Sequence, residues 1–182
     1  MSSFCTLTTR ILLPLTLGGI LLVSAGYPPT VQQGEGSFLA GNRLPDLTWQ
    51  TTAGEEIALR EQEGSALLIM FLDPAEKHDT DQLALIKPIV ERHAEAGLKV
   101  ITVCFPAEGD TTDVGAIFAE GGYEWPVVML EDRQSFEQYG VDDLPKNAIV
   151  ARNNRVLLMV GTVNRYNQQL LEGNILVALR SL

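Results

Sequence analysis

Two largely apolar runs mark the centre of this chain, at residues 67–72 and at residues 100–105, where Thr102 is the one polar residue. Runs of this length without alternation are typical of strands that are covered on both faces of a sheet. Between them, residues 79–96 place their apolar side chains at the three- and four-residue spacings of an amphipathic helix. Asp79 or Thr80 is expected to cap the start of this helix, because short polar side chains accept hydrogen bonds from the first free N–H groups.

Shorter predicted elements flank this strand–helix–strand unit. In chain order they are a hairpin over residues 47–59, a helix at 113–120, a strand at 126–130, a helical turn at 135–139, strands at 147–151 and 156–160, and a closing helix at 167–182. Asn153 and Asn154 suit the positive backbone angles of a tight turn between the last two strands. This order predicts one α/β domain, with a mixed sheet sandwiched by helices and an N-terminal β-hairpin.

The N-terminus has the pattern of an export signal. Residues 1–10 carry one positive charge and no acid, and residues 11–25 are uncharged and rich in Leu and Ile. This stretch is shorter than the ~20 residues of a spanning helix, so both a signal peptide cleaved after Ala25 and a retained membrane anchor stay open. Either one places the rest of the chain in the periplasm or an equivalent extracytoplasmic space. Residues 26–42 are interpreted as a linker, and the domain is expected at 43–182.

Charge and cysteine content narrow the possible functions. The 182 residues include 13 Lys and Arg against 23 Asp and Glu, which gives a net charge of −10. A phosphate backbone would be repelled, which argues against a nucleic-acid partner. The two cysteines are Cys5, inside the export signal, and Cys104, inside the second apolar run. Once the signal is removed, one chain has no second cysteine for a disulfide framework or a multi-cysteine zinc site.

Three segments carry a family resemblance. They are the opening hairpin with Leu-Pro-Asp-Leu-Thr-Trp at 44–49, the run Ala-Leu-Leu-Ile-Met-Phe-Leu-Asp-Pro at 66–74, and Tyr-Gly-Val-Asp-Asp-Leu-Pro-Lys at 139–146. In this order and spacing they resemble the thioredoxin superfamily, and most closely its exported TlpA/ResA-like branch, which is related to the AhpC/TSA group. The resemblance covers residues 43–182 and implies a thioredoxin-like fold. It also implies that the bond between Leu144 and Pro145 is cis.

The chain departs from the family where the chemistry would be. The resemblance places a Cys-x-x-Cys motif at the start of the first long helix, and the matching positions here are Glu76, Lys77, His78 and Asp79. Thiol–disulfide exchange needs one thiolate to attack and a second thiol to resolve the mixed disulfide, and carboxylates do neither. We therefore predict a redox-inactive domain with no catalytic residue at this degenerate active-site loop and no cofactor.

Two alternatives keep a chemical role for the chain. The first is a thiol-redox or antioxidant protein that uses Cys104 alone, against which stands the expected burial of this thiol in a strand. The second is a metal carrier that uses Glu76, His78 and Asp79, since one imidazole and two carboxylates suit a hard or borderline cation. The competing interpretation is that these acids, together with Asp81, complement the positive end of the helix dipole.

The family resemblance also implies a binding surface whose function does not require the cysteines. The resemblance implies a platform formed by residues 74–79 and 143–146, which receives partner polypeptides through the backbone of Leu144, the residue before the cis-proline. Trp125 is added to this platform as a possible binding anchor, with a core-packing role as the alternative. The hypothesis is that this domain binds another extracytoplasmic or membrane protein, while the N-terminal segment contacts the membrane.

Overall fold

The structure is a computed structural model that describes residues 37–130 and 139–181, all of which belong to one compact unit. The elements of this unit are β1 (Thr48–Gln50), β2 (Glu56–Ala58), the short 3-10 helix η1 (Leu59–Gln62), β3 (Ala66–Leu72), α1 (Lys77–His93), β4 (Leu98–Cys104), α2 (Val114–Gly121), β5 (Val127–Met129), β6 (Lys146–Val150), β7 (Val156–Val160) and α4 (Gln168–Arg180). The predicted turn at 135–139 falls almost entirely outside the described residues, as does the export signal.

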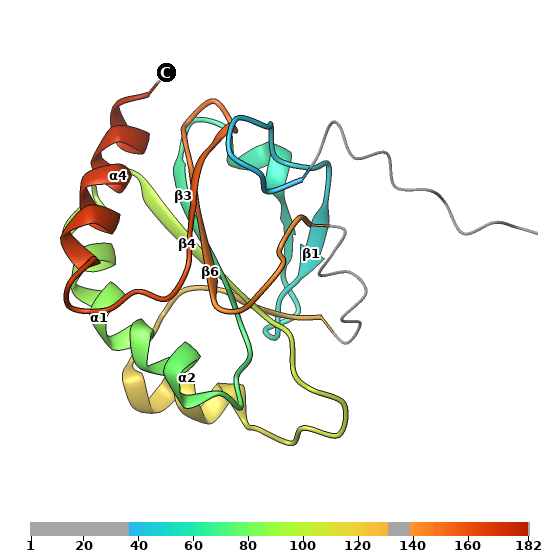
Figure 1. Cartoon of the computed structure of the whole chain (residues 1–182). Coiled ribbons are helices and arrows are strands. Elements are labelled where there is room, and N and C mark those ends of the chain that lie inside the picture. The colour runs from blue at the N-terminus through green and yellow to red at the C-terminus, as the bar shows by residue number, and fades with distance from the viewer. Residues whose placement is uncertain (1–36, 131–138, 182) are drawn as a thin grey trace, which may run out of the picture. The chain divides into compact units, whose positions relative to one another are not determined.

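A five-stranded mixed sheet forms the centre of the domain (Figure 1). Its strand order is β5-β4-β3-β6-β7; β3, β4 and β5 run parallel, and β6 and β7 are antiparallel to their neighbours. All seven residues of β3 are buried. This burial confirms the prediction from the apolar run, because a strand with neighbours on both edges and cover on both faces has no side for polar residues.

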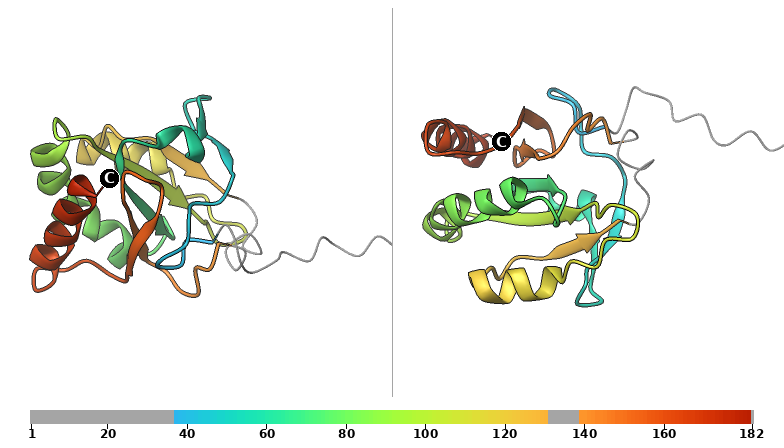
Figure 2. Two further views of the ribbon diagram at one scale, coloured as in Figure 1. Left: turned by 90° about the horizontal axis from the view of Figure 1, so that it is seen from above. Right: turned by 60° about the horizontal axis from the view of Figure 1, so that its bottom comes forward.

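The two faces of the sheet have different covers. Helices α1, α2 and α4 supply the core on one face through side chains such as Ile86, Phe118 and Ile175. The other face is covered by β1, β2 and η1, with Trp49 and Leu59 in its core (Figure 2). The α/β class with an N-terminal hairpin is confirmed. The three α-helices lie on one face of the sheet, and of the described helices only the short η1 lies on the other.

One residue before Arg43 belongs to the hydrophobic core of the domain. Phe38 is fully buried and lies at 5.0 Å, centroid to centroid, from the Phe71 ring, with Trp49 and Tyr139 also in ring contact. Its backbone N–H donates to Tyr139 O at 2.9 Å. Phe38, which the sequence analysis assigned to the linker, therefore packs into the hydrophobic core. In the part of the chain that the structure describes, no helix has the length and hydrophobicity needed to cross a membrane.

Candidate functional site

A cleft opens where β3 ends and β6 begins. The antiparallel register pairs Phe71 with Lys146, so the residues after β3 and those before β6 meet at one end of the sheet. The Leu144–Pro145 peptide bond in this cleft is cis, as the family resemblance implied. The cleft has a volume of about 320 Å³ and is lined by Asp73, Glu76, His78, Asp79, Asp142, Asp143 and Leu144. The structure thus joins the degenerate loop and the cis-proline segment, which are far apart in sequence.

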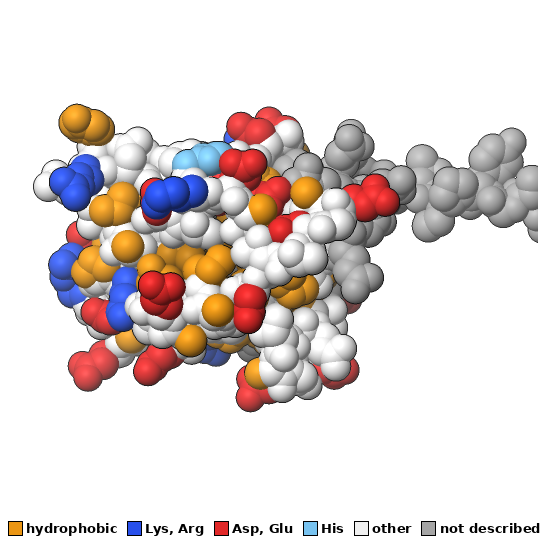
Figure 3. All heavy atoms as spheres, turned by 90° about the horizontal axis from the view of Figure 1, so that it is seen from below, with side chains coloured by type: hydrophobic (Ala, Val, Ile, Leu, Met, Phe, Trp, Pro, Cys, Tyr) orange, Lys and Arg blue, Asp and Glu red, His pale blue; other side chains and the backbone are white. Residues whose placement is uncertain are grey.

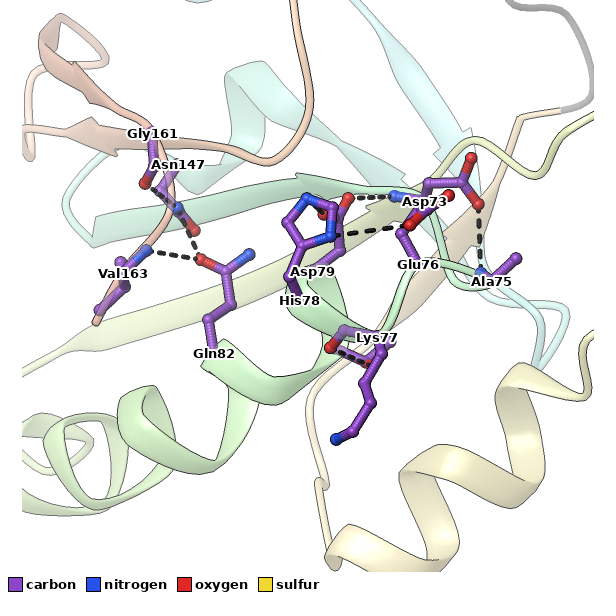
Figure 4. Close-up of polar contacts among 11 residues, drawn as sticks. Asp73, Ala75, Glu76, Lys77, His78, Asp79, Gln82, Asn147, Gly161 and Val163 are labelled. Atoms are coloured by element: carbon purple, nitrogen blue, oxygen red, sulfur yellow. Dashed lines mark hydrogen bonds and ion pairs between the residues drawn. The ribbon is translucent and has the colours of Figure 1, made fainter. Parts of the chain in front are cut away.

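His78 lies between two carboxylates at the mouth of this cleft (Figure 4). Its Nδ1 is 3.7 Å from Glu76 Oε2, and its Nε2 is 2.8 Å from Asp79 Oδ1. The second contact is an ion pair without hydrogen-bond alignment, since Asp79 Oδ1 has no aligned donor. Both imidazole nitrogens therefore face carboxylates of the loop itself.

Asp79 does not cap its own helix, contrary to the sequence prediction, and neither does Thr80. Helix α1 starts at Lys77, with Glu76 as a cap residue whose side chain makes no capping bond. The Asp79 carboxylate is instead buried and turned back toward β3, where its Oδ2 accepts a hydrogen bond from the Asp73 N–H at 2.8 Å. Asp79 thus connects the first turn of α1 to the end of the central strand.

Burial raises the pKa of Asp79, and the nearby carboxylates of Asp73 and Glu76 add to this effect. The Asp73 N–H and the His78 imidazole oppose it. Across the cleft, hydrogen bonds and ion pairs with Lys146 hold the pKa of Asp142 below its usual range, and Asp142 and Asp143 raise the pKa of Lys146. Figure 3 views this end of the domain and shows acidic side chains beside an exposed histidine. The cleft is therefore a negatively charged site.

The arrangement gives little support to a metal carrier. Glu76, His78 and Asp79 do come together, but the carboxylates contact the imidazole nitrogens that would have to bind a cation. Asp81 points elsewhere, to Lys77 at 2.5 Å. Among the residues that the structure describes, no group of three or more His, Cys, Asp or Glu side chains has the geometry of a metal site.

Cys104 lies at the end of β4 and is fully buried. Burial raises the pKa of its thiol to about 12, with a smaller contribution from the negative charge of Asp73. At neutral pH almost none of this cysteine is the thiolate that redox chemistry requires. The structure thus agrees with a packing role for Cys104.

Trp125 does not belong to the cis-proline cleft, so its predicted place on that platform is wrong. It precedes β5, and its Nε1–H donates to Thr102 Oγ1 at 2.9 Å. The ring is half-buried against Phe118 and Tyr123, and it also lines a second groove along β4. The ring contacts agree with the packing role of Trp125, whereas its role as a binding anchor stays a prediction.

Sequence reasoning missed a buried amide pair beneath the cleft. Asn147 of β6 donates from Nδ2 to Gln82 Oε1 of α1 at 3.1 Å and to Gly161 O at 3.0 Å, and the Val163 N–H donates to the same Gln82 oxygen (Figure 4). These bonds join α1 to the strand that follows the cis-proline. The only signal in the sequence was a polar residue at the first position of the predicted strand 147–151, whose other residues are apolar.

Comparisons with known proteins give a consistent result, although no family model matches the chain. The thiol-disulfide oxidoreductases ResA of Bacillus thuringiensis (strain Al Hakam) and Bacillus anthracis are each 19% identical over 160 residues, which cover 85% of this chain and 89% of the relative. Among solved structures, a DsbE-type thiol:disulfide interchange protein from Chlorobium tepidum has a TM-score of 0.68 at 23% identity, covering 79% of this chain and 99% of that one.

Two further solved structures share the fold. The thioredoxin domain of a thiol-disulfide oxidoreductase from Bacteroides vulgatus has a TM-score of 0.63 at 14% identity, over 75% of this chain and 98% of that one. A secreted disulfide oxidoreductase from Mycobacterium tuberculosis has a TM-score of 0.59 at 12% identity, over 72% and 96%. At these identities the structural likeness shows a common fold, and the chemistry must be argued from the site.

Proposed function

We propose that this chain, a TlpA/ResA-like domain of the thioredoxin superfamily, is a redox-inactive extracytoplasmic domain that binds an extended, basic segment of another protein beside its cis-proline. The observation that carries the proposal is a cleft with the position of a thioredoxin-type site but with carboxylates in place of thiols. Glu76 and Asp79 stand at the two ends of the degenerate loop, and both line the cleft.

The lack of thiol chemistry follows from the cysteines. The sequence contains only Cys5 and Cys104, so no Cys-x-x-Cys pair exists anywhere in it. The pKa of Cys104 is about 12, and its side chain is fully buried. A thiol that is neither ionised nor accessible cannot attack a disulfide, and it has no second thiol of the same chain beside it.

The backbone next to the cis-proline supports peptide binding. Leu144 lines the cleft, and its N–H and C=O make no hydrogen bond with any of the residues that the structure describes. A peptide in extended conformation pairs with such free backbone groups in the manner of an added strand. The cleft therefore offers a site for a partner's main chain without any need for cysteine.

The charge of the cleft selects the partner's side chains. Five carboxylates line it, from Asp73, Glu76, Asp79, Asp142 and Asp143. Lys146 is a cation at its edge, and it is already paired with Asp142 and Asp143. Complementary charge therefore favours a partner segment that carries Lys or Arg, with an association rate that falls as the salt concentration rises.

Export of the domain is part of the proposal. It rests on the charged N-terminus and apolar stretch of residues 1–25, and on a structural neighbour that is described as secreted. Retention of residues 11–25 as an anchor would keep the cleft close to membrane proteins.

The test uses two measurements on the full chain. Reduction of insulin in the presence of dithiothreitol is expected to proceed at the rate of the protein-free control. A fluorescein-labelled Gly-Lys-Ala-Lys-Gly peptide is expected to bind more tightly than Gly-Glu-Ala-Glu-Gly, and added salt is expected to weaken its binding. Asp142→Asn with Asp143→Asn should weaken the basic peptide several-fold, because these changes remove two carboxylates and leave Lys146 unpaired.

The matched control neutralises two exposed acids away from the cleft, Glu61→Gln with Glu95→Gln, and should leave binding almost unchanged. Insulin turnover by the wild-type chain would contradict the redox-inactive role. Equal binding of both peptides, or equal effects of the two double variants, would contradict the cleft as the binding site.

A further inference from the structure

Half of strand β4 has an open edge. Along its whole length β4 pairs with β3, but on its other edge it pairs with β5 only from Thr102 to Cys104. The pairing stops there for a reason visible in the sequence. The residue before β5 is Pro126, which has no N–H to continue the ladder.

The directions of the backbone bonds identify the free groups. The Thr102 N–H donates to Pro126 O, and Cys104 O accepts from the Leu130 N–H, so these two residues face the β5 edge. Alternate residues of a strand face the same edge, and therefore Leu98 and Val100 face it too. On that edge they make no hydrogen bond with any described residue.

These free groups lie at the bottom of a groove of about 620 Å³. One wall is formed by the α1 side chains of Val90 and Ala94, and the opposite wall contains Ile57 of β2. Leu98 and Val100 are only 5% and 4% exposed, so the open edge is recessed.

The depth of the groove and the charges that line it determine which kind of partner segment can bind there. The edge of a second sheet, with its own flanking elements, cannot reach the bottom of a groove between α1 and β2, whereas a single extended strand can. Lys99 already donates to Gln62, and Lys87 to Gly121 O, but the carboxylates of Glu55 and Glu124 make no ion pair or hydrogen bond with described residues. A basic side chain would complement these two acids.

We infer that the groove binds an extended segment of a partner protein, which adds as a short strand beside residues 98–100. Its alternate apolar side chains contact Trp125 and Val90, and a Lys or Arg faces Glu55 and Glu124. This gives Trp125 the role of a binding anchor, at a site other than the cis-proline cleft. The two sites share no lining residue, so this inference does not depend on the proposed function.

Amide hydrogen exchange on the full chain tests the inference directly. The probe is the peptide acetyl-Lys-Val-Thr-Val-Lys-amide. Its addition should slow exchange at the N–H groups of Leu98 and Val100, which gain acceptors, and should leave Ile101 unchanged, because that N–H faces β3. Slow exchange at Leu98 and Val100 before any peptide is added would contradict the inference. Residues of this chain would then already cover the edge, and no partner protein could pair with it.

Two N-methylated forms of the probe provide the backbone control. One is methylated on both Val residues and the other on Thr and the last Lys, so each loses two backbone donors that lie on one strand edge. One form should lose binding by at least about tenfold, and the other should retain it. Equal affinities would show that the peptide does not pair as a strand.

A pair of identical substitutions locates the site. Ala94 is exposed on the wall of the groove, whereas Ala119 is exposed on α2 and lines neither site. Ala94→Tyr should fill the groove and weaken the probe by at least about tenfold, and Ala119→Tyr should not. Equal effects of the two changes would refute the groove as the binding site. The cis-proline cleft is also acidic, so the same comparison is repeated in the Asp142→Asn with Asp143→Asn variant, where Ala94→Tyr should still weaken the probe. No effect of Ala94→Tyr in that variant would assign the binding to the cis-proline cleft and refute the groove.

Discussion

The ends of β3 and β4 lie side by side but differ in what they expose. Leu72 and Cys104 are partners in the parallel register, so each strand stops at the same level of the sheet. After Leu72 the chain enters the open cleft, which holds acids and no thiol. The end of β4 holds the only described cysteine, which is fully buried. The accessible cleft thus lies at the end of β3, whereas the cysteine lies at the end of β4. Thiol chemistry requires a cysteine that is itself accessible.

Two buried ionisable groups make this difference concrete. Burial raises the pKa of both Asp79 and Cys104. For Asp79 the Asp73 N–H and the His78 imidazole oppose the effect of burial on the pKa, and the carboxylate lines the cleft. For Cys104 the second contribution, the negative charge of Asp73, raises the pKa further. A buried acid can therefore remain connected to a functional surface, whereas this buried thiol belongs to the packing of the sheet.

The largest effect that would break this comparison concerns the reactivity of Cys104. Because its pKa is about 12 rather than about 9, the thiolate fraction at pH 8 is lower by about a thousandfold. Alkylation of Cys104 by iodoacetamide should therefore be at least that much slower in the folded chain than in the chain unfolded by guanidinium. Mass spectrometry of the peptide that contains Cys104 measures it. Similar rates in the two states would mean that the thiol is accessible.

Substitution of the same cysteine should affect stability rather than function. Cys104→Ser places a hydroxyl among apolar side chains and should lower the free energy of unfolding by about 2 kcal/mol. Cys104→Ala, the matched control, removes the sulfur without adding a polar group and should cost less. Denaturant titration measures both. A serine variant that is as stable as wild type but loses peptide binding would indicate a role at the cleft.

Thiols introduced at the other strand end should become reactive. In the double variant Glu76→Cys with Asp79→Cys, the first thiol lies at the N-terminus of α1. Because a helix N-terminus lowers a thiol pKa to about 7, this cysteine should be alkylated at pH 7 about tenfold faster than an ordinary cysteine. Insulin reduction should appear with it. The control Glu76→Ser with Asp79→Ser removes the same carboxylates and should remain inactive. If the cysteine pair reacted no faster than a free thiol, the cleft would lack the environment that the fold suggests.

The smallest predicted effect is on the pH dependence of stability. The folded-state pKa of Asp79 is raised above its unfolded value, so its contribution to stability is present at low pH and is lost as the pH rises through the folded pKa. Asp79→Asn keeps an acceptor for the Asp73 N–H and should increase the free energy of unfolding at pH 7 by about 1 kcal/mol. The advantage should shrink on acidification. An advantage that grows as the pH falls would reverse the assigned direction of the pKa change.

Much of the fold could be predicted because the signals for its helices and strands lie within short stretches of the sequence. The apolar runs that became β3 and β4 and the helical spacing within α1 appear in the sequence without reference to distant residues. The positive φ of 59° at Asn154 likewise agrees with the predicted turn. The start of α1 was placed two residues too late, because Asp79 looked like a cap and instead bonds to the end of β3.

The candidate site could be predicted only in part. The degenerate loop and Pro145 were identified from a family resemblance, and the cis bond followed. The position of Trp125 was wrong because this residue precedes β5, which runs parallel to β4 and β3, and it therefore lies at the opposite end of the sheet from the residues that follow β3. Asn147 was missed because a buried amide is recognisable only when its partner, Gln82, is known.

The sequence by itself determined the class of fold, the acidic character and the absence of a cysteine pair, since these depend on residue types and their local spacing. Only the tertiary structure decided that five carboxylates surround one cleft, that Cys104 is sealed and that Pro126 leaves an edge of β4 open. The physical reason is that burial, pKa and unpaired backbone groups are set by neighbours that are distant along the chain. Those neighbours meet only when the strands take their places in the sheet.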